Sequence, residues 1–421
     1  MNFSALPKTA MGILMVMIFI IPQSFMALKL PLLAVVLIGM MMEGIRNRWE
    51  IRSRAVQPYY ILFCLMSITW AIIGLTKGND EIAIMEALRV YVIYMVIYFV
   101  LVIFVSNLNY ETHVDQIVII GALGIGLVAI YTLADQIVSL GWIPQFIKDE
   151  MFLEVGLHDG YVQMNNVNIG MLTFIAPYLL SRLMLSEPND RHAYLILALV
   201  VAVVAAILAS RRIVLILLLI VPLLIFTIHI ITCQPNRYYL QRRSRNYFLI
   251  LLTTGVGIWL FSYWGLDFFD GFVGRVMSAF DSDNDDVRSL QHAALMSGFT
   301  DNFFWGTGFG GVTDVIRSDE RPWTFELTYS RLLFNGGLIG FGLVMLFYIV
   351  YLLLVLHKIR HAAHAPLYIS LLVGFLSVSI ASATNPYLSS FDFLFALSII
   401  PLILNTEDQP HERSTNEQAQ P

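Results

Sequence analysis

Arginines gather in polar segments that the hydrophobic pattern places on one side of a membrane. Arg211 and Arg212 stand between two apolar runs, and further arginines follow in a long polar stretch: Arg275, Arg288, Arg317, Arg321 and Arg331. A planar guanidinium group binds two phosphate oxygens at once, so several such groups suit a diphosphate. Because arginine inside a span costs about 3 kcal/mol by insertion scales, this concentration predicts an anionic partner. The alternative is that each arginine pairs with a nearby acidic residue or a lipid headgroup.

Glu326 lies at the end of the same polar stretch, directly before an apolar run. A carboxylate at such a border can accept the proton of an attacking hydroxyl group. On a helix, Tyr329 and Ser330 share a face with Glu326. Glu326 is therefore a candidate general base, and Tyr329 lies beside it. The alternative for Glu326 is an ion pair with an arginine of the same loop.

The elements that position these residues are predicted to be membrane-spanning helices. Of the 421 residues, 58% are hydrophobic and only 13% are charged, against about 25% charged in average soluble domains. A helical span needs about 20 mostly apolar residues. The apolar runs predict twelve spans near 9–28, 30–45, 58–76, 86–105, 115–139, 166–186, 193–209, 213–232, 247–265, 335–356, 367–383 and 389–404.

Basic residues of the short loops predict the orientation of these spans. With the N-terminus in the cytoplasm, the cytoplasmic loops contain Arg46, Arg48, Arg52, Arg54, Arg191, Arg237, Arg242, Arg243, Arg245, Lys358 and Arg360. Cytoplasmic loops are typically rich in lysine and arginine. Both termini are therefore predicted to be cytoplasmic, and Arg211, Arg212 and the arginines of the long polar stretch fall on the opposite face. The net charge of −5 argues against a nucleic-acid partner.

The chain divides into four predicted parts. Residues 1–265 hold the first nine spans, 266–334 form a large outer loop with short helices, 335–404 hold three spans, and 405–421 form a disordered cytoplasmic tail. The large loop contains an acidic run from Asp281 to Asp286 and a cluster of glycines. A loop of this length is usually functional or disordered. Its aromatic residues favour an ordered piece that lies on the membrane or dips toward it.

Three short motifs resemble the O-antigen polymerase and O-antigen ligase superfamily. The stretch from Arg288 to Gly311, with an arginine, a helical segment and a glycine-rich turn, is similar to the large periplasmic loop of that family. The stretch from Glu326 to Gly340 resembles a second signature, in which a polar residue precedes a G-x-x-G pattern. Ser210, Arg211 and Arg212 resemble the S-R pair at the end of a mid-chain span.

The resemblance implies an all-α, GT-C-like, polytopic bundle of about twelve transmembrane helices in the bacterial inner membrane. It implies a metal-independent glycosyltransferase without a cofactor, whose active site faces the periplasm. Its substrate would be an undecaprenyl-diphosphate-linked oligosaccharide, with membrane lipids and a chain-length regulator as further partners. The substrate-binding residues would be Arg211, Arg212, Arg275, Arg288, Arg331 and Tyr329. In ligases a histidine occupies the position of Glu326, which favours the polymerase branch here.

Two other functions stay open, namely a ligase of the same superfamily and a transporter of lipid-linked sugar. Transporters usually place ionisable groups at the midplane of the bilayer, whereas the charges here gather at one edge. The glycines from Gly306 to Gly311 fit G-x-G-x-x-G, but no strand precedes them, so we predict a tight turn. Gly336 and Gly340 predict close helix packing. The run from Asp281 lacks the glycine of a calcium loop and predicts a solvated acidic loop.

Overall fold

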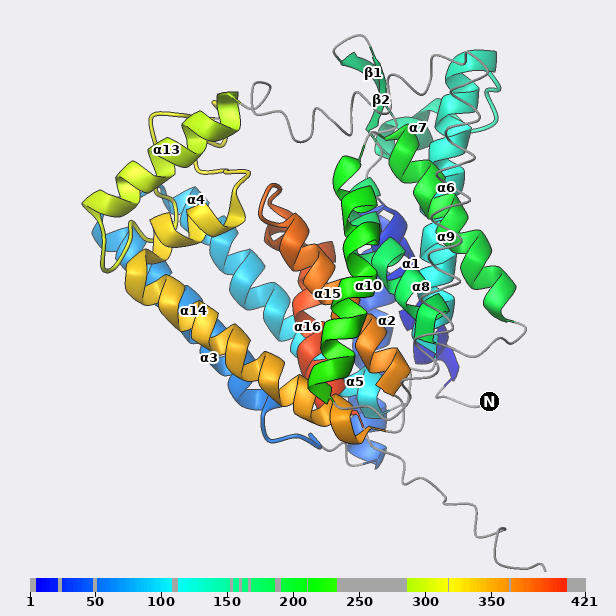
Figure 1. The fold of residues 1–421 in the computed structure, drawn as a ribbon, viewed down its shortest axis with the longest axis horizontal. Coiled ribbons are helices and arrows are strands. Elements are labelled where there is room, and N and C mark those ends of the chain that lie inside the picture. The colour runs from blue at the N-terminus through cyan, green and yellow to red at the C-terminus, as the bar shows by residue number, and fades with distance from the viewer. Residues whose placement is uncertain are drawn as a thin grey trace, which may run out of the picture.

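The computed structural model describes residues 5–21, 25–47, 51–107, 113–151, 154–158, 161–165, 168–185, 191–209, 211–232, 286–316, 318–362 and 365–406. These residues form a bundle of helices with a layer of shorter elements at one end (Figure 1). The predicted span 247–265, Arg275, and the side chain of Arg212 lie outside the described part of the chain.

Every predicted span within the described residues falls on a helix. In chain order the helices and turns are α1 (Ala5–Ile20), α2 (Met26–Asn47), α3 (Val56–Thr76), α4 (Glu81–Leu88), the π-helical turn η1 (Arg89–Ile93), α5 (Tyr94–Asn107), α6 (Val114–Val138), α7 (Gln145–Glu150), the 3₁₀ turn η3 (Ile169–Met171), α8 (Leu172–Leu185), α9 (Arg191–Leu208), α10 (Arg212–Thr232), α13 (Asp286–Asp301), α14 (Thr328–His361), α15 (Ala365–Ala381), the 3₁₀ turn η5 (Tyr387–Ser389) and α16 (Phe391–Asn405). A helix satisfies its own backbone hydrogen bonds, which is why apolar segments adopt it in lipid.

Five helical segments among the described residues are long and apolar enough to cross a bilayer. They are Val56–Thr76, Glu81–Asn107, Val114–Val138, Ile213–Thr232 and Thr328–His361. Shorter apolar helices of 10–17 residues occupy the remaining predicted spans in the described part. These helices support a multi-pass helical membrane protein, while the count of twelve spans stays a prediction.

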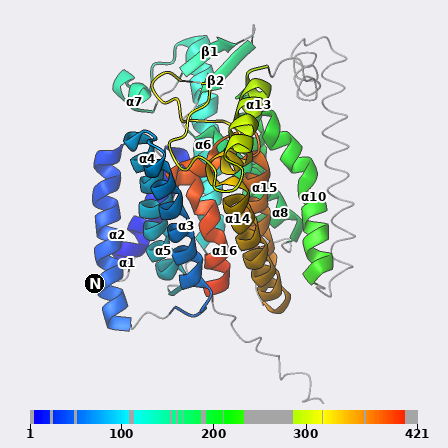
Figure 2. The same ribbon diagram turned by 90° about the vertical axis from the view of Figure 1, so that its left-hand side faces the viewer.

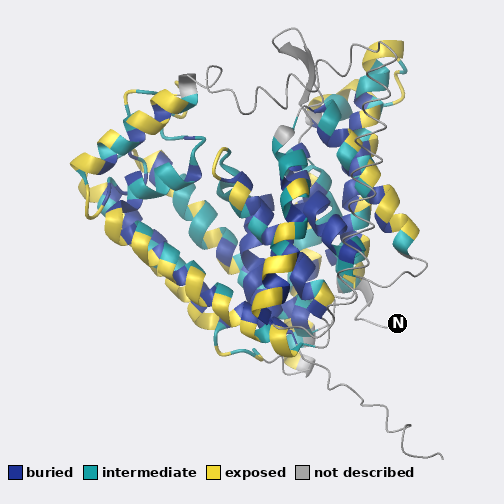
Figure 3. Ribbon diagram, in the orientation of Figure 1, coloured by how far each residue is buried: buried dark blue, intermediate teal, exposed yellow. Residues whose placement is uncertain are grey.

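The helices at the centre of the bundle are more buried than the helices at its flank. α8, α15 and α16 are buried along most of their length, whereas α3 and α14 carry many exposed side chains (Figure 3). The exposed residues of α3 and α14 include Leu62, Leu65, Leu346 and Leu353. Exposed leucines on long apolar helices suit contact with lipid chains rather than with water.

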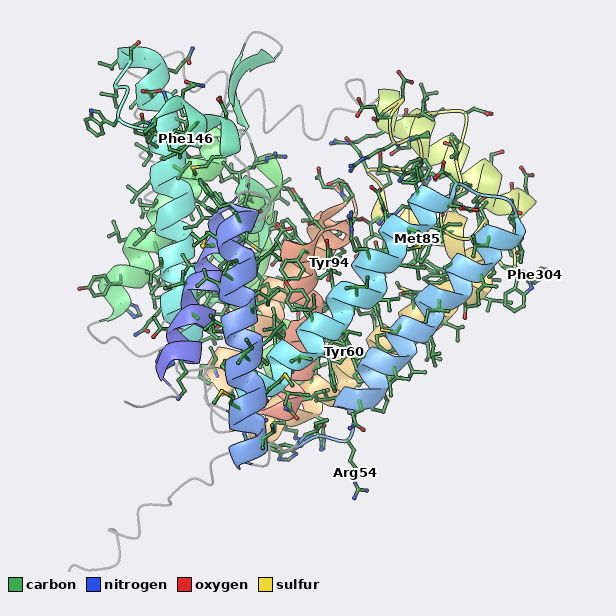
Figure 4. All side chains as sticks on the ribbon, turned by 180° about the vertical axis from the view of Figure 1, so that it is seen from behind. Arg54, Tyr60, Met85, Tyr94, Phe146 and Phe304 are labelled. Atoms are coloured by element: carbon green, nitrogen blue, oxygen red, sulfur yellow. The ribbon has the colours of Figure 1, made fainter. Side chains whose placement is uncertain are left out.

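Hydrogen bonds fix which loops share an end of the bundle. The Asn405 side chain accepts from the backbone N–H of Arg52 at 2.9 Å, and Lys358 Nζ donates to Thr406 O at 2.8 Å. Two of the basic loops predicted to be cytoplasmic therefore meet at one end, where Figure 4 shows Arg54. α13 and the β-hairpin lie at the opposite end (Figure 2).

α14 is broken near its start, at Gly337, where φ is 60° and ψ is −168°. Only glycine adopts this backbone region readily. The break frees backbone groups that the preceding loop then pairs, through Thr307 N to Phe334 O, Gly308 N to Asn335 O, Leu338 N to Phe303 O, and Ile339 N to Phe304 O, all at 2.7–3.1 Å. The loop thus supplies the hydrogen bonds that the helix lacks.

The glycine cluster of this loop forms tight turns against α3, as predicted. Gly306, Gly308 and Gly310 all have positive φ, between 68° and 81°. A Cβ atom on Gly308 would lie 2.2 Å from the backbone nitrogen of Gly74 on α3. The Asn79 amide donates to two carbonyl groups of the same loop. The cluster is therefore a structural clamp between the outer loop, α3 and α14.

The described part of the chain is helical, as the all-α prediction requires, apart from one short hairpin in which β1 (Glu154–His158) pairs antiparallel with β2 (Tyr161–Asn165). The end of the predicted 266–334 loop forms a short helix from Thr328, and the break at Gly337 separates it from the span that was predicted to begin near 335. The prediction of close packing at Gly336 and Gly340 is confirmed, because the Trp70 indole lies directly against both positions.

A partly buried ion pair joins α6 and α8 near the end of the bundle that carries Arg54. Arg182 Nε and Nη2 donate to the two carboxylate oxygens of Asp115 at 2.8 and 2.6 Å. The Tyr178 hydroxyl donates to the same carboxylate at 2.7 Å. Because the guanidinium group and the carboxylate satisfy each other, this pair has a structural role.

Candidate functional site

Arg288 and Glu326, which the sequence selected separately, form an ion pair. Arg288 Nε lies 2.5 Å from Glu326 Oε2, and the Glu326 side chain is 14% exposed against 37% for Arg288. The backbone N–H of Glu326 donates to Gln291 Oε1 at 3.0 Å. Arg288 and Gln291, the two residues of α13 that contact Glu326, lie one turn apart on the same face of that helix. The alternative interpretation of Glu326, an ion pair with a loop arginine, is therefore the arrangement seen here.

A second polar contact joins the same two helices one turn further on. His292 Nδ1 lies 2.9 Å from Ser330 Oγ. Below it, Leu295 of α13 packs with Phe325 and Phe334 in a small apolar cluster. The sequence analysis did not select His292, although its spacing of four residues from Arg288 matches that of Ser330 from Glu326. α13 is thus seated on the start of α14 by two polar contacts and an apolar cluster.

Arg331, one turn into α14, points toward the turn η5 between α15 and α16. Its Nη2 donates to Ser389 Oγ at 2.6 Å and to the Tyr91 hydroxyl at 3.0 Å. Both partners are uncharged, and no carboxylate pairs with Arg331 within the described ranges. Its positive charge is therefore oriented but not neutralised by protein groups.

Tyr329 is committed to a structural hydrogen bond. Its hydroxyl donates to the backbone carbonyl of Ser379 on α15 at 2.6 Å. The next residue back, Thr328, donates to the carbonyl of Asn385 at 3.3 Å. The start of α14 is therefore fastened to the α15 side of the site. Tyr329 was predicted to bind substrate, but its hydroxyl proton is donated to Ser379 O in this structure.

Arg211 approaches the same turn η5 from the start of α10. It is half-buried, and its Nε has no hydrogen-bond partner among the described residues. The hydroxyl of Tyr387, the first residue of η5, is likewise buried without a partner in the described structure. Burial raises the pKa of the Tyr387 phenol, and the positive charges of Arg211 and Arg288 partly oppose this shift. Both arginines therefore contribute positive potential at the Tyr387 hydroxyl.

Three of the five predicted substrate-binding arginines thus act on residues of one three-residue turn, Arg331 by a hydrogen bond and Arg211 and Arg288 through their charge. Arg331 reaches Ser389 at one end of η5, and Arg211 and Arg288 act on Tyr387 at its other end. For the other two, Arg212 has no described side chain and Arg275 lies outside the described residues. The sequence analysis missed Tyr387, since it stands in a short connection that carries no motif.

A cavity of about 470 Å³ opens beside this turn. Its outer part is lined by Glu86, Arg89, Arg321, Trp323 and Arg331, and its deeper part by apolar residues of α3, α14, α15 and α16, among them Phe63, Met66, Val344, Phe375 and Leu397. Arg211 and Arg288 are not among the lining residues, whereas Arg331 and Ser389 are. A cavity that is cationic outside and apolar inside matches an amphipathic ligand with an anionic head.

The rim of the cavity holds one acidic residue between two larger side chains. Trp323 Nε1 donates to Glu86 Oε2 at 3.2 Å, and Arg321 Nη2 lies 3.8 Å from Glu86 Oε1. No group of three or more metal-binding side chains occurs in the described part of the chain. The chemistry that the site offers is therefore anion binding by arginines and proton transfer by Glu326 or His292.

No protein-family model matches this chain, and no curated protein is significantly similar to it in sequence.

Proposed function

We propose that this protein is a polysaccharide polymerase that joins undecaprenyl-diphosphate-linked repeat units at the periplasmic face of the bacterial inner membrane. The single observation that supports it most is the hydrogen bond from Arg331 to Ser389 of the turn η5, at the cationic outer part of a cavity with an apolar interior. A twelve-span, GT-C-like architecture and cytoplasmic termini belong to the same proposal. The motifs of the Arg288–Gly311 and Glu326–Gly340 stretches are its basis in sequence.

The cavity suits the carrier lipid of such a substrate. Its deep walls come from helices that also expose leucines along the flank of the bundle. A polyprenyl chain would lie along these walls, while its diphosphate would stay at the cationic outer end near Arg331. Exposed aromatic residues at the outer loop, Phe304 and Trp305, suit the interface between membrane and water. This placement would hold the reacting sugar at the outer face.

The reaction needs a hydroxyl of one repeat unit to attack the anomeric carbon of the next. The bond from that carbon to the diphosphate oxygen breaks, and the diphosphate leaves with an additional negative charge. Arginines fixed around the leaving group stabilise this charge more in the transition state than in the ground state. Glu326 would take the proton of the attacking hydroxyl once its ion pair with Arg288 loosens.

The polymerase is distinguished from a ligase and a transporter by the products of a deletion strain. Single repeat units on the acceptor lipid indicate a lost polymerase. Polymer that remains attached to its carrier indicates a lost ligase, and repeat units trapped in the cytoplasmic leaflet indicate a lost transporter. Gel ladders of surface polysaccharide and analysis of the carrier lipid separate these outcomes.

Point variants connect the function to the site. Arg331→Ala and Arg288→Ala should abolish chain elongation while the protein still inserts into the membrane. Arg288→Lys should restore little activity, because lysine lacks the bidentate guanidinium. Arg54→Ala removes an arginine at the opposite end of the bundle and is the matched control, with a normal ladder expected. Normal polymer length in both alanine variants at the site would contradict the proposal.

A further inference from the structure

The connection from α6 to α7 turns its charged groups inward and its large apolar groups outward. The Asp135 carboxylate pairs with Lys148 of α7 and accepts from Gly141 N at 2.7 Å. The side chains of Asp135 and Lys148 are only 17% and 20% exposed. Four large apolar side chains, which we call the apolar corner, are at least 66% exposed: Ile137, Val138, Trp142 and Phe146. This is the reverse of the arrangement that water favours.

The apolar corner is held by an ordered turn (Figure 4 labels Phe146 there). Ser139, which caps the end of α6, has a φ of 52°, and Gly141 follows with a φ of 64°. Ile143 N donates to the Tyr131 hydroxyl at 2.9 Å, and the centroids of the Tyr131 and Trp142 rings lie 6.3 Å apart. The exposed rings are therefore presented by a fixed backbone.

Two ion pairs mark the ends of the apolar part of α6. Asp115 in the first turn of the helix pairs with Arg182, and Asp135 in the last turn pairs with Lys148. The two carboxylates stand twenty residues apart, with no charged residue between them. This length of helix rises about 30 Å, which matches the hydrocarbon thickness of a bilayer. The apolar corner therefore falls just beyond the hydrocarbon layer, at the membrane–water interface.

The apolar corner also continues an exposed apolar stripe along α6. Ile120, Leu127 and Ile130 are exposed on this helix, which is long and apolar enough to cross a bilayer. Together with Ile137 they fall within about 100° of the helix circumference. A stripe of this kind on a membrane span faces lipid chains. The corner thus extends a lipid-facing surface to the end of the span.

The charges of this connection favour an apolar contact over an electrostatic one. Asp135 neutralises Lys148, and Asp149 accepts from the Gln145 amide at 2.7 Å. The described residues of the connection therefore present no excess positive charge, which attraction to anionic headgroups would need. Tryptophan is enriched where headgroups meet acyl chains, because its ring is apolar and its N–H is polar.

We infer that the apolar corner anchors α6 at the membrane interface, with Trp142 and Phe146 inserted between phospholipid headgroups and the adjoining part of the acyl chains. The partner of this surface is the bilayer itself and not another protein. The contact fixes the depth of α6, whatever reaction the protein catalyses.

Spin labels on single cysteines test this contact in phosphatidylcholine nanodiscs. In the full-length chain without its native cysteines, labels at Trp142→Cys and Phe146→Cys report collisions with oxygen, which dissolves in lipid, and with a nickel chelate, which stays in water. Leu127→Cys on the exposed stripe is the lipid control, and Asp319→Cys in the exposed outer loop is the water control. Both corner labels should show a loss of nickel collisions and a gain of oxygen collisions relative to Asp319→Cys.

The native side chain gives a second measurement that needs no label. The difference in fluorescence between the wild type and Trp142→Phe reports Trp142 alone, and phospholipid brominated near its headgroup should quench this difference. An unquenched difference, or nickel collisions equal to those of Asp319→Cys, would place the corner in water and overturn the inference. Loss of collisions with both reagents would mean that a protein covers the corner, which also overturns it.

The lipid headgroup is varied to separate apolar from electrostatic contact. Equal collision rates in phosphatidylglycerol and phosphatidylcholine support the apolar anchor. Insertion in phosphatidylglycerol alone would contradict it.

Discussion

Replacing Glu326 with glutamine should change binding and catalysis in opposite directions. Glu326 holds Arg288 through a 2.5 Å contact, so an incoming phosphate must compete with this carboxylate for the guanidinium group. A hydrogen bond between charged groups contributes about 1.5–3 kcal/mol. Because Arg288 is 37% exposed, solvent screening reduces this to about 1 kcal/mol. Glu326→Gln should therefore tighten pyrophosphate binding about fivefold.

The same variant should produce no elongation, because an amide cannot take the proton of the attacking hydroxyl. Pyrophosphate affinity is measured on the purified protein, and elongation is read from the polysaccharide ladder of a complemented deletion strain. Asp135→Asn is the control, since Asp135 is a carboxylate near the outer end of α6 that pairs with Lys148 and should not affect either readout. In the Arg288→Ala background, adding Glu326→Gln should tighten pyrophosphate binding less than it does in the wild-type background. Weaker pyrophosphate binding in Glu326→Gln would refute the competition, and a normal ladder would refute the base.

Three further predictions address the fold. Gly337→Ala should lower the free energy of unfolding by more than about 3 kcal/mol, because the backbone conformation of Gly337 excludes a side chain and the added Cβ would lie 2.4 Å from Gly306 N. Gly342 has open space around it, so Gly342→Ala should be neutral or stabilising in the same thermal-unfolding assay. Asp115→Ala should cost about 1–3 kcal/mol by removing the carboxylate that accepts from the partly buried Arg182 and from Tyr178, yet leave the ladder of the surviving protein intact. In a cysteine-free chain, Trp305→Cys should react with an impermeant maleimide in whole cells and Arg54→Cys only after permeabilisation; the reverse pattern would invert the proposed orientation.

The helical architecture could be read from the sequence because it depends on local composition. Uninterrupted apolar runs predict helices without knowledge of their neighbours, and every predicted span in the described part lies on one. The short helix that precedes the break at Gly337 lies outside the predicted span, since it carries Thr328, Tyr329, Ser330 and Arg331. These polar groups face protein partners rather than lipid, a distinction that hydropathy does not record.

The candidate site was only partly predictable. Arg211, Arg288 and Arg331 were found by charge alone, because arginine at the edge of a span needs a reason. The relation of these arginines to the turn η5 could not be predicted, since it depends on interactions between residues 58 or more positions apart, such as Arg331 with Ser389. Tyr387 and His292 were missed because nothing in their local sequence distinguishes them. Only the orphaned hydroxyl of Tyr387 marks it, and that is a property of the folded chain.

The clamp between the outer loop and α3 has a consequence for biosynthesis. Lys77 and Asn79 donate to the carbonyl groups of Gly306, Thr307 and Phe309, about 230 positions later in the chain. Because the N-terminal helices are synthesised first, these donors are made long before the acceptors that they bind in the folded chain. A nascent chain that stops before Gly306 would integrate its early helices yet never form this junction. The candidate site would then be completed late, because Arg331 and Ser389 both lie in the last third of the chain.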